Sequence, residues 1–370
     1  MAKILFYISS LNRGGAERVL LSVMDFCKDE HEILLLTDIY AEDEYPLPDC
    51  IKRICLADGN TKNRNRISAA CNRIVAIRRV CKKEKVELAI AFMSSSGIRL
   101  EMATYFMKIK TAIAIRNNPS DELADKKRRK LLLASLKQAN GVIFQMESQK
   151  ELFDKEIQEK AAVIYNPANE QFCRAEFTGE RKDKIVTVGR LFDYKNQGLL
   201  IDSFSDMKKT FPNMKLYIYG EGEYREALEK QIQKLNLQED VFLPGAISDV
   251  ADKIEDARMF VLPSDTEGMP NTLMEAMMLG LPVISTDCPC GGPRTLIENG
   301  KNGLLVPVGD RNALTMAMEK ILGDEAFASR IGQNAKNIRN LCDRAVIRKE
   351  WLNYIHQLLD NCTENEDMIE

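Results

Sequence analysis

The stretch EGMPNTLMEAMMLGLPVIST, residues 267–286, carries the pattern that decides the fold. It follows an apolar run at 259–262, which is typical of a buried parallel strand. Pro270 is tolerated in the first turn of a helix, and apolar residues then recur at helical spacing as far as Gly280, a common helix cap. The stretch therefore predicts a loop after a strand, then a helix with Glu275 one turn from its start.

The same alternation of short apolar strands and amphipathic helices runs through the whole chain. It predicts α/β architecture with doubly wound parallel sheets. At 370 residues the chain suits two domains rather than one core. The strands predicted for the first half cover 4–8, 33–37, 88–92, 111–115, 141–145 and 162–165, and those for the second half cover 184–188, 215–219, 241–243, 259–262, 283–285 and 303–306.

A break in this pattern at Asn166 predicts a linker between the two sheets. We expect an N-terminal Rossmann-like domain over residues 1–166 and a C-terminal Rossmann-like domain over 167–344. Because ligands bind at the carboxyl ends of parallel strands, both domains are expected to direct loops into one interdomain cleft. The remaining residues predict a helix over 345–362 and a disordered acidic tail over 363–370.

The composition is that of a globular protein, since 45% of the residues are hydrophobic and charges of both signs are mixed. No run approaches the roughly 20 apolar residues of a membrane helix. The short strand after Met1 also lacks the apolar core of a signal peptide. We therefore expect a cytoplasmic protein, and we interpret its ten scattered cysteines as reduced.

Metal ligands are sparse in the sequence. Cys288 and Cys290 form the one close cysteine pair, with no second pair or histidine cluster near them in the sequence, and His31 and His356 are the only histidines. These features do not favour a zinc centre. The chain also has no Asp-x-Asp sequence to hold a divalent ion on a nucleotide. We therefore expect no metal and no other cofactor.

Positive charge concentrates between Lys52 and Lys85, although the whole chain has a formal net charge of −3. The segment 52–85 is either a solvated helix face or a surface for anionic lipid headgroups, because apolar residues such as Ile74 and Ile77 are interspersed. Nucleic acid is not expected, since the segment lacks interleaved aromatic residues and the protein is acidic overall. The lipid interpretation predicts peripheral contact with the inner face of the cell membrane.

Several motifs together resemble a known enzyme family. Glu267 and Glu275 form an E-x7-E pattern ahead of Gly-x-Pro-Val-Ile, and Arg190 and Lys195 belong to a GR-x4-KN sequence after a predicted strand. Two glycines follow the first strand, and GGPRTLIENGKNGLLVPVGD occupies 291–310. This combination resembles the family-4 glycosyltransferases, which retain anomeric configuration and have the GT-B fold of two Rossmann-like domains. The resemblance covers nearly the whole chain, most tightly its second half.

The resemblance implies a nucleotide-diphosphate sugar as donor, with a UDP-sugar expected first. It implies that Arg190 and Lys195 hold the diphosphate, that Glu275 binds the ribose and that Glu267 binds the donor sugar. A guanidinium fork and a mobile ammonium suit phosphate oxygens, and a helix N-terminus adds a positive dipole end. We therefore take Glu267, Arg190 and Lys195 as the candidate catalytic residues. The further donor-binding candidates are Gly14, Gly15, Gly220, Ala246, Ile247, Met269, Pro270, Asn271, Thr272 and Leu273.

The first-domain part of this site departs from the family pattern. Many relatives have a histidine in the segment that here contains Arg116, Asn117 and Asn118. We hypothesise that these residues contact the donor sugar or the acceptor. The resemblance further implies that a hexose or N-acetylhexosamine is transferred to a glycan or lipid-linked saccharide in surface polysaccharide biosynthesis. It also implies that the helix over 345–362 crosses back to the N-terminal domain.

Three other functions compete with this prediction. A glycosidase needs two carboxylates across one bond, about 5 to 9.5 Å apart, with water as acceptor, whereas the cations and helix ends near these glutamates suit a leaving diphosphate. A UDP-sugar epimerase shares the architecture but does not centre on these motifs. A catalytically inactive GT-B partner subunit or scaffold is expected to lose phosphate or sugar ligands, and Arg190, Lys195, Glu267 and Glu275 are all present.

Overall fold

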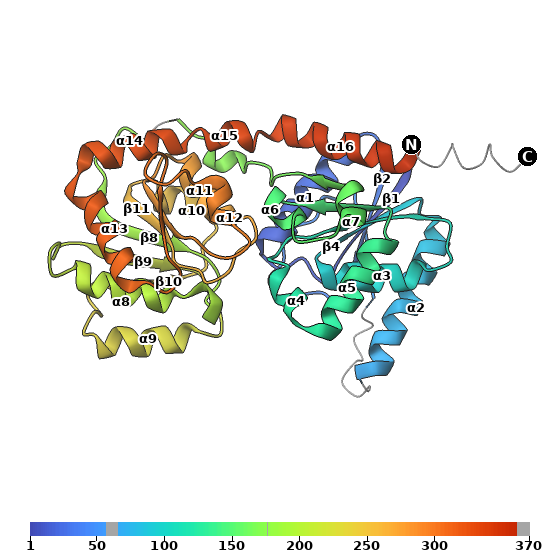
Figure 1. The fold of residues 1–370 in the computed structure, drawn as a ribbon, viewed down its shortest axis with the longest axis horizontal. Coiled ribbons are helices and arrows are strands. Elements are labelled where there is room, and N and C mark those ends of the chain that lie inside the picture. Colours follow the sequence, from blue (N-terminus) through green and yellow to red (C-terminus); the bar gives the residue numbers. More distant parts are fainter. Residues whose placement is uncertain (57–65, 176, 361–370) are drawn as a thin grey trace, which may run out of the picture. The chain divides into compact units, whose positions relative to one another are not determined.

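The computed structural model describes residues 1–56, 66–175 and 177–360 (Figure 1). The acidic tail expected over 363–370 and residues 57–65 of the basic segment lie outside the described residues. The chain divides into two compact units. The first unit comprises Met1–Pro167 and Arg344–Glu370, and the second comprises Ala168–Asp343. Among the described residues, no helix has the length and apolar character needed to span a membrane.

The first unit is built on a seven-stranded sheet in the order β3-β2-β1-β4-β5-β6-β7, with every pairing parallel. Its strands are β1 (Lys3–Ile8), β2 (Glu32–Thr37), β3 (Lys52–Cys55), β4 (Leu88–Phe92), β5 (Lys110–Ala114), β6 (Gly141–Phe144) and β7 (Ala161–Val163). Its helices are α1 (Gly15–Cys27), α2 (Arg66–Glu84), α3 (Ser94–Thr104), α4 (Ser120–Ala124), α5 (Lys126–Gln138), α6 (Glu147–Lys150), α7 (Lys155–Glu159) and α16 (Arg344–Asp360).

Helices cover both faces of this sheet, which explains why its inner strands are apolar along their whole length. Phe6 of β1 joins a core with α1 and α16, whereas Tyr7 joins a core on the opposite face with α2 and α3. Trp351 of α16 is fully buried and stacks on Phe92 of β4, with ring centroids 5.9 Å apart. The C-terminal helix is therefore part of the first unit's core.

Strand β3 is absent from our sequence-based expectations. Its residues, KRIC, belong to the basic segment, and none of them is fully buried. A short, charged strand is common at the edge of a sheet, where it discourages pairing with another chain. An edge position also removes the continuous apolar pattern by which we recognised the other strands.

The second unit has a six-stranded parallel sheet in the order β10-β9-β8-β11-β12-β13. Its strands are β8 (Lys182–Val188), β9 (Lys215–Tyr219), β10 (Val241–Gly245), β11 (Ala257–Leu262), β12 (Val283–Thr286) and β13 (Leu304–Val306). Its α-helices are α8 (Gln197–Met207), α9 (Arg225–Lys234), α10 (Val250–Ile254), α11 (Asn271–Met278), α12 (Gly292–Leu296), α13 (Arg311–Gly323), α14 (Glu325–Ala335) and α15 (Ile338–Leu341), with short 3-10 helices at Glu170–Phe172 and Asp193–Lys195.

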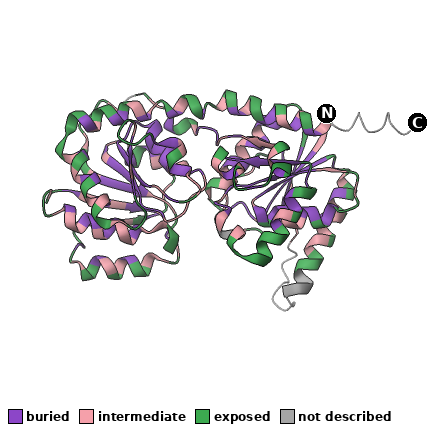
Figure 2. Cartoon of the chain, in the orientation of Figure 1, coloured by how far each residue is buried: buried purple, intermediate pink, exposed green. Residues whose placement is uncertain are grey.

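In both units the strands are largely buried and the exposed residues concentrate on the helices (Figure 2). The α/β class and the two Rossmann-like parallel sheets predicted from the sequence are confirmed. Each sheet reverses its strand order once, between β1 and β4 in the first and between β8 and β11 in the second. Such a switch point separates the loops that follow its two strands and is the usual ligand position in this architecture.

Candidate functional site

An ion pair occupies the switch point of the second sheet. Lys195 follows β8, Glu267 follows β11, and the Lys195 Nζ atom lies 2.7 Å from Glu267 Oε1. Ser264 Oγ donates a second hydrogen bond of 2.7 Å to the same oxygen. The lysine and glutamate side chains are only 18% and 10% exposed, so little solvent screens them. Two of the three predicted catalytic residues, Lys195 and Glu267, are thus brought together at the position where the topology favours a ligand.

A second link joins the same two loops. Asn196 Nδ2 donates to Asp265 Oδ1 at 2.7 Å, and the Asp265 N–H donates to the Tyr194 carbonyl at 2.8 Å. Asn196 has the left-handed backbone that asparagine tolerates, and its Oδ1 caps α8 by accepting from the Leu199 N–H. The asparagine of GR-x4-KN therefore shapes the loop that presents Lys195.

Arg190 stands on the loop after β8, exposed to solvent. Its Nη2 donates to the Tyr194 hydroxyl at 3.3 Å, and its guanidinium lies 5.0 Å from the centre of the Phe192 ring. Within the described part of the chain no carboxylate forms an ion pair with Arg190. Its positive charge is therefore available to an anion that approaches Lys195.

Gly220 and Gly222 permit the loop after β9 to approach this arginine loop. A Cβ atom on Gly220 would lie 1.9 Å from the Gly189 carbonyl oxygen, and one on Gly222 would lie 2.2 Å from that of Leu191. Both residues have positive φ, which other residues rarely adopt. The Gly-x-Gly sequence thus has a structural explanation. The backbone N–H of Gly220 also donates a hydrogen bond to the carbonyl of Gly245, the last residue of β10, which directly precedes Ala246 and Ile247.

Helix α11 begins one residue later than its sequence implies. Pro270 occupies the N-cap position, where no side chain makes a capping hydrogen bond, and Asn271 and Thr272 lie inside the first turn. Backbone N–H groups at such an end attract anions, which keeps 269–273 a candidate phosphate cradle. Glu275 lies in the second turn and is only 4% exposed, a burial that the sequence did not predict.

Gly292 supports the loop that carries Glu267. A Cβ atom at this position would lie 1.7 Å from the Gly268 carbonyl oxygen. Only glycine therefore allows α12 to pack against the residue next to Glu267. The close contact explains why a glycine stands at position 292 in the GGPRT sequence after β12, which the sequence alone did not show.

Cys288, which also follows β12, is a buried cysteine. Burial raises the pKa of its thiol to about 12, which disfavours the thiolate that binds metals.

In the first unit, Gly14 occupies the N-cap of α1 and Gly15 begins that helix. A Cβ atom on Gly14 would lie 2.3 Å from Glu17 Oε2, which is the movable end of a flexible side chain, so the fold does not require glycine at this position. As a glycine, the N-cap residue has no side chain with which to form a capping hydrogen bond. These two glycines are positioned as the sequence predicted, at the loop that follows β1.

Arg116 follows β5 and is buried. Its Nη1 donates to Asn166 Oδ1 at 3.2 Å, and its guanidinium lies 5.1 Å from the centre of the Phe92 ring and 5.2 Å from that of Trp351. Burial lowers the pKa of this guanidinium to about 9. Its Nε and Nη2 atoms are buried without a hydrogen-bond partner. The Arg116 side chain therefore packs against the core, and two of its nitrogen atoms have N–H groups that could still donate hydrogen bonds to a ligand.

The two asparagines beside it also make local bonds. Asn117 Nδ2 donates to Glu122 Oε1 at 3.3 Å, and Asn118 Oδ1 accepts from the Ser120 N–H at 3.0 Å. A neighbouring cluster was not predicted at all: Arg99 of α3 donates to the Tyr7 hydroxyl and to Asp38 Oδ2, at 2.7 and 2.9 Å. No local motif signals this cluster, because its members come from three separate elements.

The geometry agrees with comparisons of the whole chain. The family model for "Glycosyl transferases group 1" matches residues 170–338. An uncharacterized glycosyltransferase of Methanocaldococcus jannaschii is 30% identical over 332 residues, which is 75% of this chain and 81% of that protein. The chain belongs to this family. It is accordingly a glycosyltransferase, and the matched residues cover most of the unit that contains Lys195 and Glu267.

Two further similarities describe the activity of a relative and the fold. The chain is 27% identical, over 97% of its length and 99% of the relative's, to a Campylobacter jejuni protein named "GalNAc-alpha-(1->4)-GalNAc-alpha-(1->3)-diNAcBac-PP-undecaprenol alpha-1,4-N-acetyl-D-galactosaminyltransferase". Anabaena HepE, solved in complex with UDP, matches 96% of this glycosyltransferase and 100% of its own chain, with a TM-score of 0.79 and 18% identity. The fold of this glycosyltransferase is GT-B.

Proposed function

We propose that this glycosyltransferase transfers an N-acetylhexosamine or a hexose from a UDP-sugar to a saccharide linked to undecaprenyl diphosphate, with retention of anomeric configuration. The observation that carries the proposal is the Lys195–Glu267 pair at the switch point of the second sheet. The activity for which the C. jejuni relative is named and the UDP in the HepE structure support this choice of acceptor and donor class.

The two cations of GR-x4-KN suit the leaving diphosphate. A lysine ammonium has three donors, and Glu267 uses one of them. Lys195 can therefore bind a phosphate oxygen without leaving Glu267. The guanidinium of Arg190 adds a fork for a second oxygen. We assign both residues to the charge that develops as the sugar–phosphate bond breaks, which requires no metal ion.

The glutamates suit the hydroxyl groups of the donor. Ser264 and Lys195 both bind Oε1 of Glu267, so we assign its other oxygen to the hydroxyls of the transferred sugar. We assign Glu275 to the ribose, with the N–H groups of the first α11 turn beside the phosphates. Because Glu275 is buried, its role requires a ribose that reaches down to the helix surface. Ala246 and Ile247 are assigned to backbone contacts with the base.

The donor is tested by thermal stabilisation. UDP-N-acetylgalactosamine, other UDP-sugars and GDP-sugars are each added to the purified enzyme, because a ligand that binds only the folded state raises the unfolding temperature. We expect the UDP-sugars to stabilise and the preferred one to be transferred to a synthetic saccharide on undecaprenyl diphosphate. Stabilisation by GDP-sugars alone would overturn the donor assignment. Transfer only to acceptors without a lipid diphosphate would overturn the acceptor assignment.

A lipid-linked acceptor also favours the membrane interpretation of the basic segment. Two of its charges are compensated internally, because Lys52 pairs with Glu84 at 2.8 Å and Arg53 pairs with Glu44 at 2.5 Å. Arg79, Lys82, Lys83 and Lys85 of the α2 region remain exposed. The loop after α3 exposes Tyr105 and Phe106, the latter by 89%, and Arg78 of α2 donates to the Tyr105 carbonyl at 2.8 Å.

We therefore propose that α2 and Phe106 contact an anionic membrane surface, since cations attract the headgroups and an exposed aromatic ring enters the interface. Phe106→Asp should reduce co-sedimentation with phosphatidylglycerol vesicles by about tenfold. Met316→Asp provides a control, because Met316 is a 68% exposed apolar residue of the second unit. Equal losses in the two variants, or none in Phe106→Asp, would refute the assignment of this surface.

A further inference from the structure

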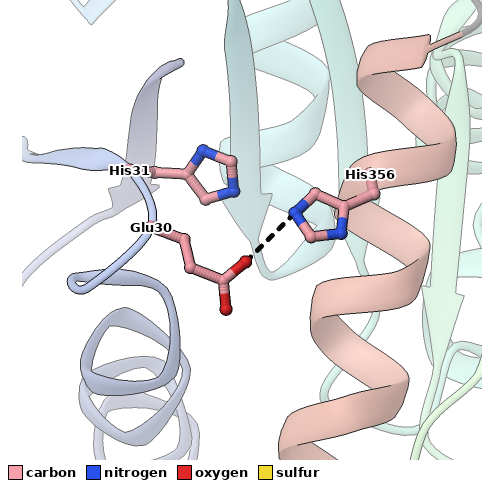
Figure 3. Close-up of side chains that lie close together, drawn as sticks. All are labelled: Glu30, His31 and His356. Carbon is pink, nitrogen blue, oxygen red and sulfur yellow. Dashed lines mark ion pairs between the residues drawn. The ribbon is translucent and has the colours of Figure 1, made fainter. Parts of the chain in front are cut away.

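The only two histidines of the chain meet in the first unit beside a glutamate (Figure 3). Glu30 and His31 lie between α1 and β2, and His356 projects from α16. The His356 Nε2 atom lies 3.3 Å from Glu30 Oε2, and the two imidazole rings have centroids 5.5 Å apart. One ligand atom from each of the three side chains lies within 4.8 Å of the others. This meeting was not predicted from the sequence, because 325 positions separate the two histidines.

His31 is the unusual member of this group. Its side chain belongs to a residue only 6% exposed, and both of its ring nitrogens are buried without a hydrogen-bond partner. A buried polar atom without a partner costs free energy, so such atoms call for an explanation. The backbone holds the ring in place, because the His31 N–H donates to the Cys27 carbonyl at the end of α1. A bound cation would give a ring nitrogen the partner it lacks.

One positively charged side chain, Arg348, lies near the carboxylate of Glu30 but does not occupy the oxygen that faces His356. Arg348 of α16 faces the acidic side, with its Nη2 atom 3.9 Å from Glu30 Oε1 and 3.7 Å from Asp29 Oδ2. Glu30 nevertheless directs its other oxygen to His356.

We propose that Glu30, His31 and His356 form a binding site for Zn²⁺ or a similar divalent transition metal. Two imidazoles and a carboxylate are a common donor set for such ions, with water as a fourth ligand. Metal–ligand bonds of about 2.0 to 2.1 Å in tetrahedral geometry place neighbouring ligand atoms about 3.3 to 3.5 Å apart. The 3.3 Å between Glu30 and His356 already meets this condition. His31 offers a ring nitrogen within 4.8 Å of both of these atoms.

The site would fasten the C-terminal helix to the rest of its unit. Glu30 and His31 precede β2, whereas His356 lies near the end of α16, so the metal would join distant parts of the chain. Arg344 already anchors the start of α16 through Asp25, with a 2.7 Å ion pair. A metal at His356 would secure the opposite end of the helix. This role is independent of the donor site and does not rest on the proposed transfer reaction.

Metal titration of the untagged full-length enzyme tests the proposal. The protein is stripped with a chelator and titrated with Zn²⁺ against a chromophoric competitor, and then with Co²⁺, whose visible absorption reports coordination geometry. We expect one tight site per chain, at least tenfold weaker in His356→Gln and in Glu30→Gln. Asp29→Asn and Gln357→Ala are controls, because they change exposed neighbours on the same loop and the same helix.

Comparison among these variants separates the site from zinc binding by cysteines, since the cysteines are unchanged in all of them. Zn²⁺ in about 100-fold excess over its dissociation constant should also raise the unfolding temperature of the wild type by about 5 °C. That rise should disappear in His356→Gln, which replaces a partly exposed side chain and should itself fold. Equal zinc affinity in the wild type and both ligand variants would overturn the proposal, as would absence of a tight site in the wild type.

Discussion

The two units share one architecture but use their strand ends differently. In the second unit the loops at the switch point hold a charged, hydrogen-bonded pair, Lys195 and Glu267, and the loop after β8 also carries Arg190, which forms no ion pair within the described residues. In the first unit the loop after β5, one strand beyond the switch point, presents side chains that already serve the domain: Arg116 packs beside two stacked aromatic rings and Asn117 binds Glu122. Parallel-sheet topology therefore determines where a ligand can bind, whereas the loop residues determine which unit can bind an anion.

Among the predicted effects, the loss of activity on removal of Lys195 from the second unit's site should be the largest. Lys195→Ala should lower kcat/KM by about 10² to 10³-fold, because a donor directed at developing charge is worth that much in comparable sites. Lys182→Ala is the matched control, since Lys182 also pairs with a carboxylate but lies at the opposite end of β8. Steady-state transfer kinetics provide the measurement. A Lys195→Ala enzyme with wild-type kcat/KM would remove the lysine from the mechanism.

A methyl group at Gly292 should disturb the same site without changing any charge. Gly292→Ala should destabilise the enzyme by about 2 to 4 kcal/mol, because the added atom meets the Gly268 carbonyl oxygen and must displace the Glu267 loop. In Gly323→Ala the same methyl group meets no atom within 4 Å, so stability should be unchanged or slightly higher. Chemical denaturation compares the two. Similar stabilities of both variants would contradict the close packing that we describe.

The first unit contains a buried carboxyl whose effect depends on pH. Burial raises the pKa of Glu101 in α3 to about 7, above its ordinary value of 4.5. The folded protein therefore binds a proton that the unfolded chain releases, so this group's contribution to stability falls as pH rises from about 4.5 to 7. Glu101→Gln should be more stable than the wild type at pH 8, by about 3 kcal/mol, with little difference at pH 4.

Denaturation midpoints of Glu101→Gln and the wild type at several pH values measure this difference. The glutamine resembles the protonated carboxyl, so its advantage should appear only where the wild-type side chain ionises. A constant difference at every pH would show that the substitution acts through packing. Since Glu101 is not one of the predicted donor-site residues, donor affinity should not change.

Arg116 should give the smallest and most selective effect. Arg116→Lys keeps a positive charge but loses the planar fork and its contacts with Phe92 and Trp351. If its unpaired donors contact the sugar or acceptor, turnover should fall about tenfold while UDP-sugar affinity stays unchanged. Turnover and donor binding are measured on the same preparation. Unchanged turnover would show that Arg116 has a structural role only. The loop after β5 in the first unit would then contribute no ligand contact through this residue, in contrast to the loops of the second unit.

Local patterns in the sequence predicted much of this molecule. Apolar periodicity identified twelve of the thirteen strands in the described residues, together with the parallel architecture, because each buried strand carries its signal within a few residues. The GR-x4-KN and E-x7-E sequences similarly placed Lys195 and Glu267 on loops after β8 and β11. The missing strand, β3, is a charged edge strand whose pairing depends on β2 rather than on its own pattern.

Only the tertiary structure decided which of these residues meet. The sequence did not show that Glu275 is buried, that Arg116 contacts the rings of both Phe92 and Trp351, or that His31 meets His356. Each fact depends on elements brought together from distant parts of the chain, and no local spacing encodes such contacts. The sequence by itself therefore determined the fold class, the enzyme family and the donor-site motifs. Long-range packing determined the burial, the partners and the proposed metal site.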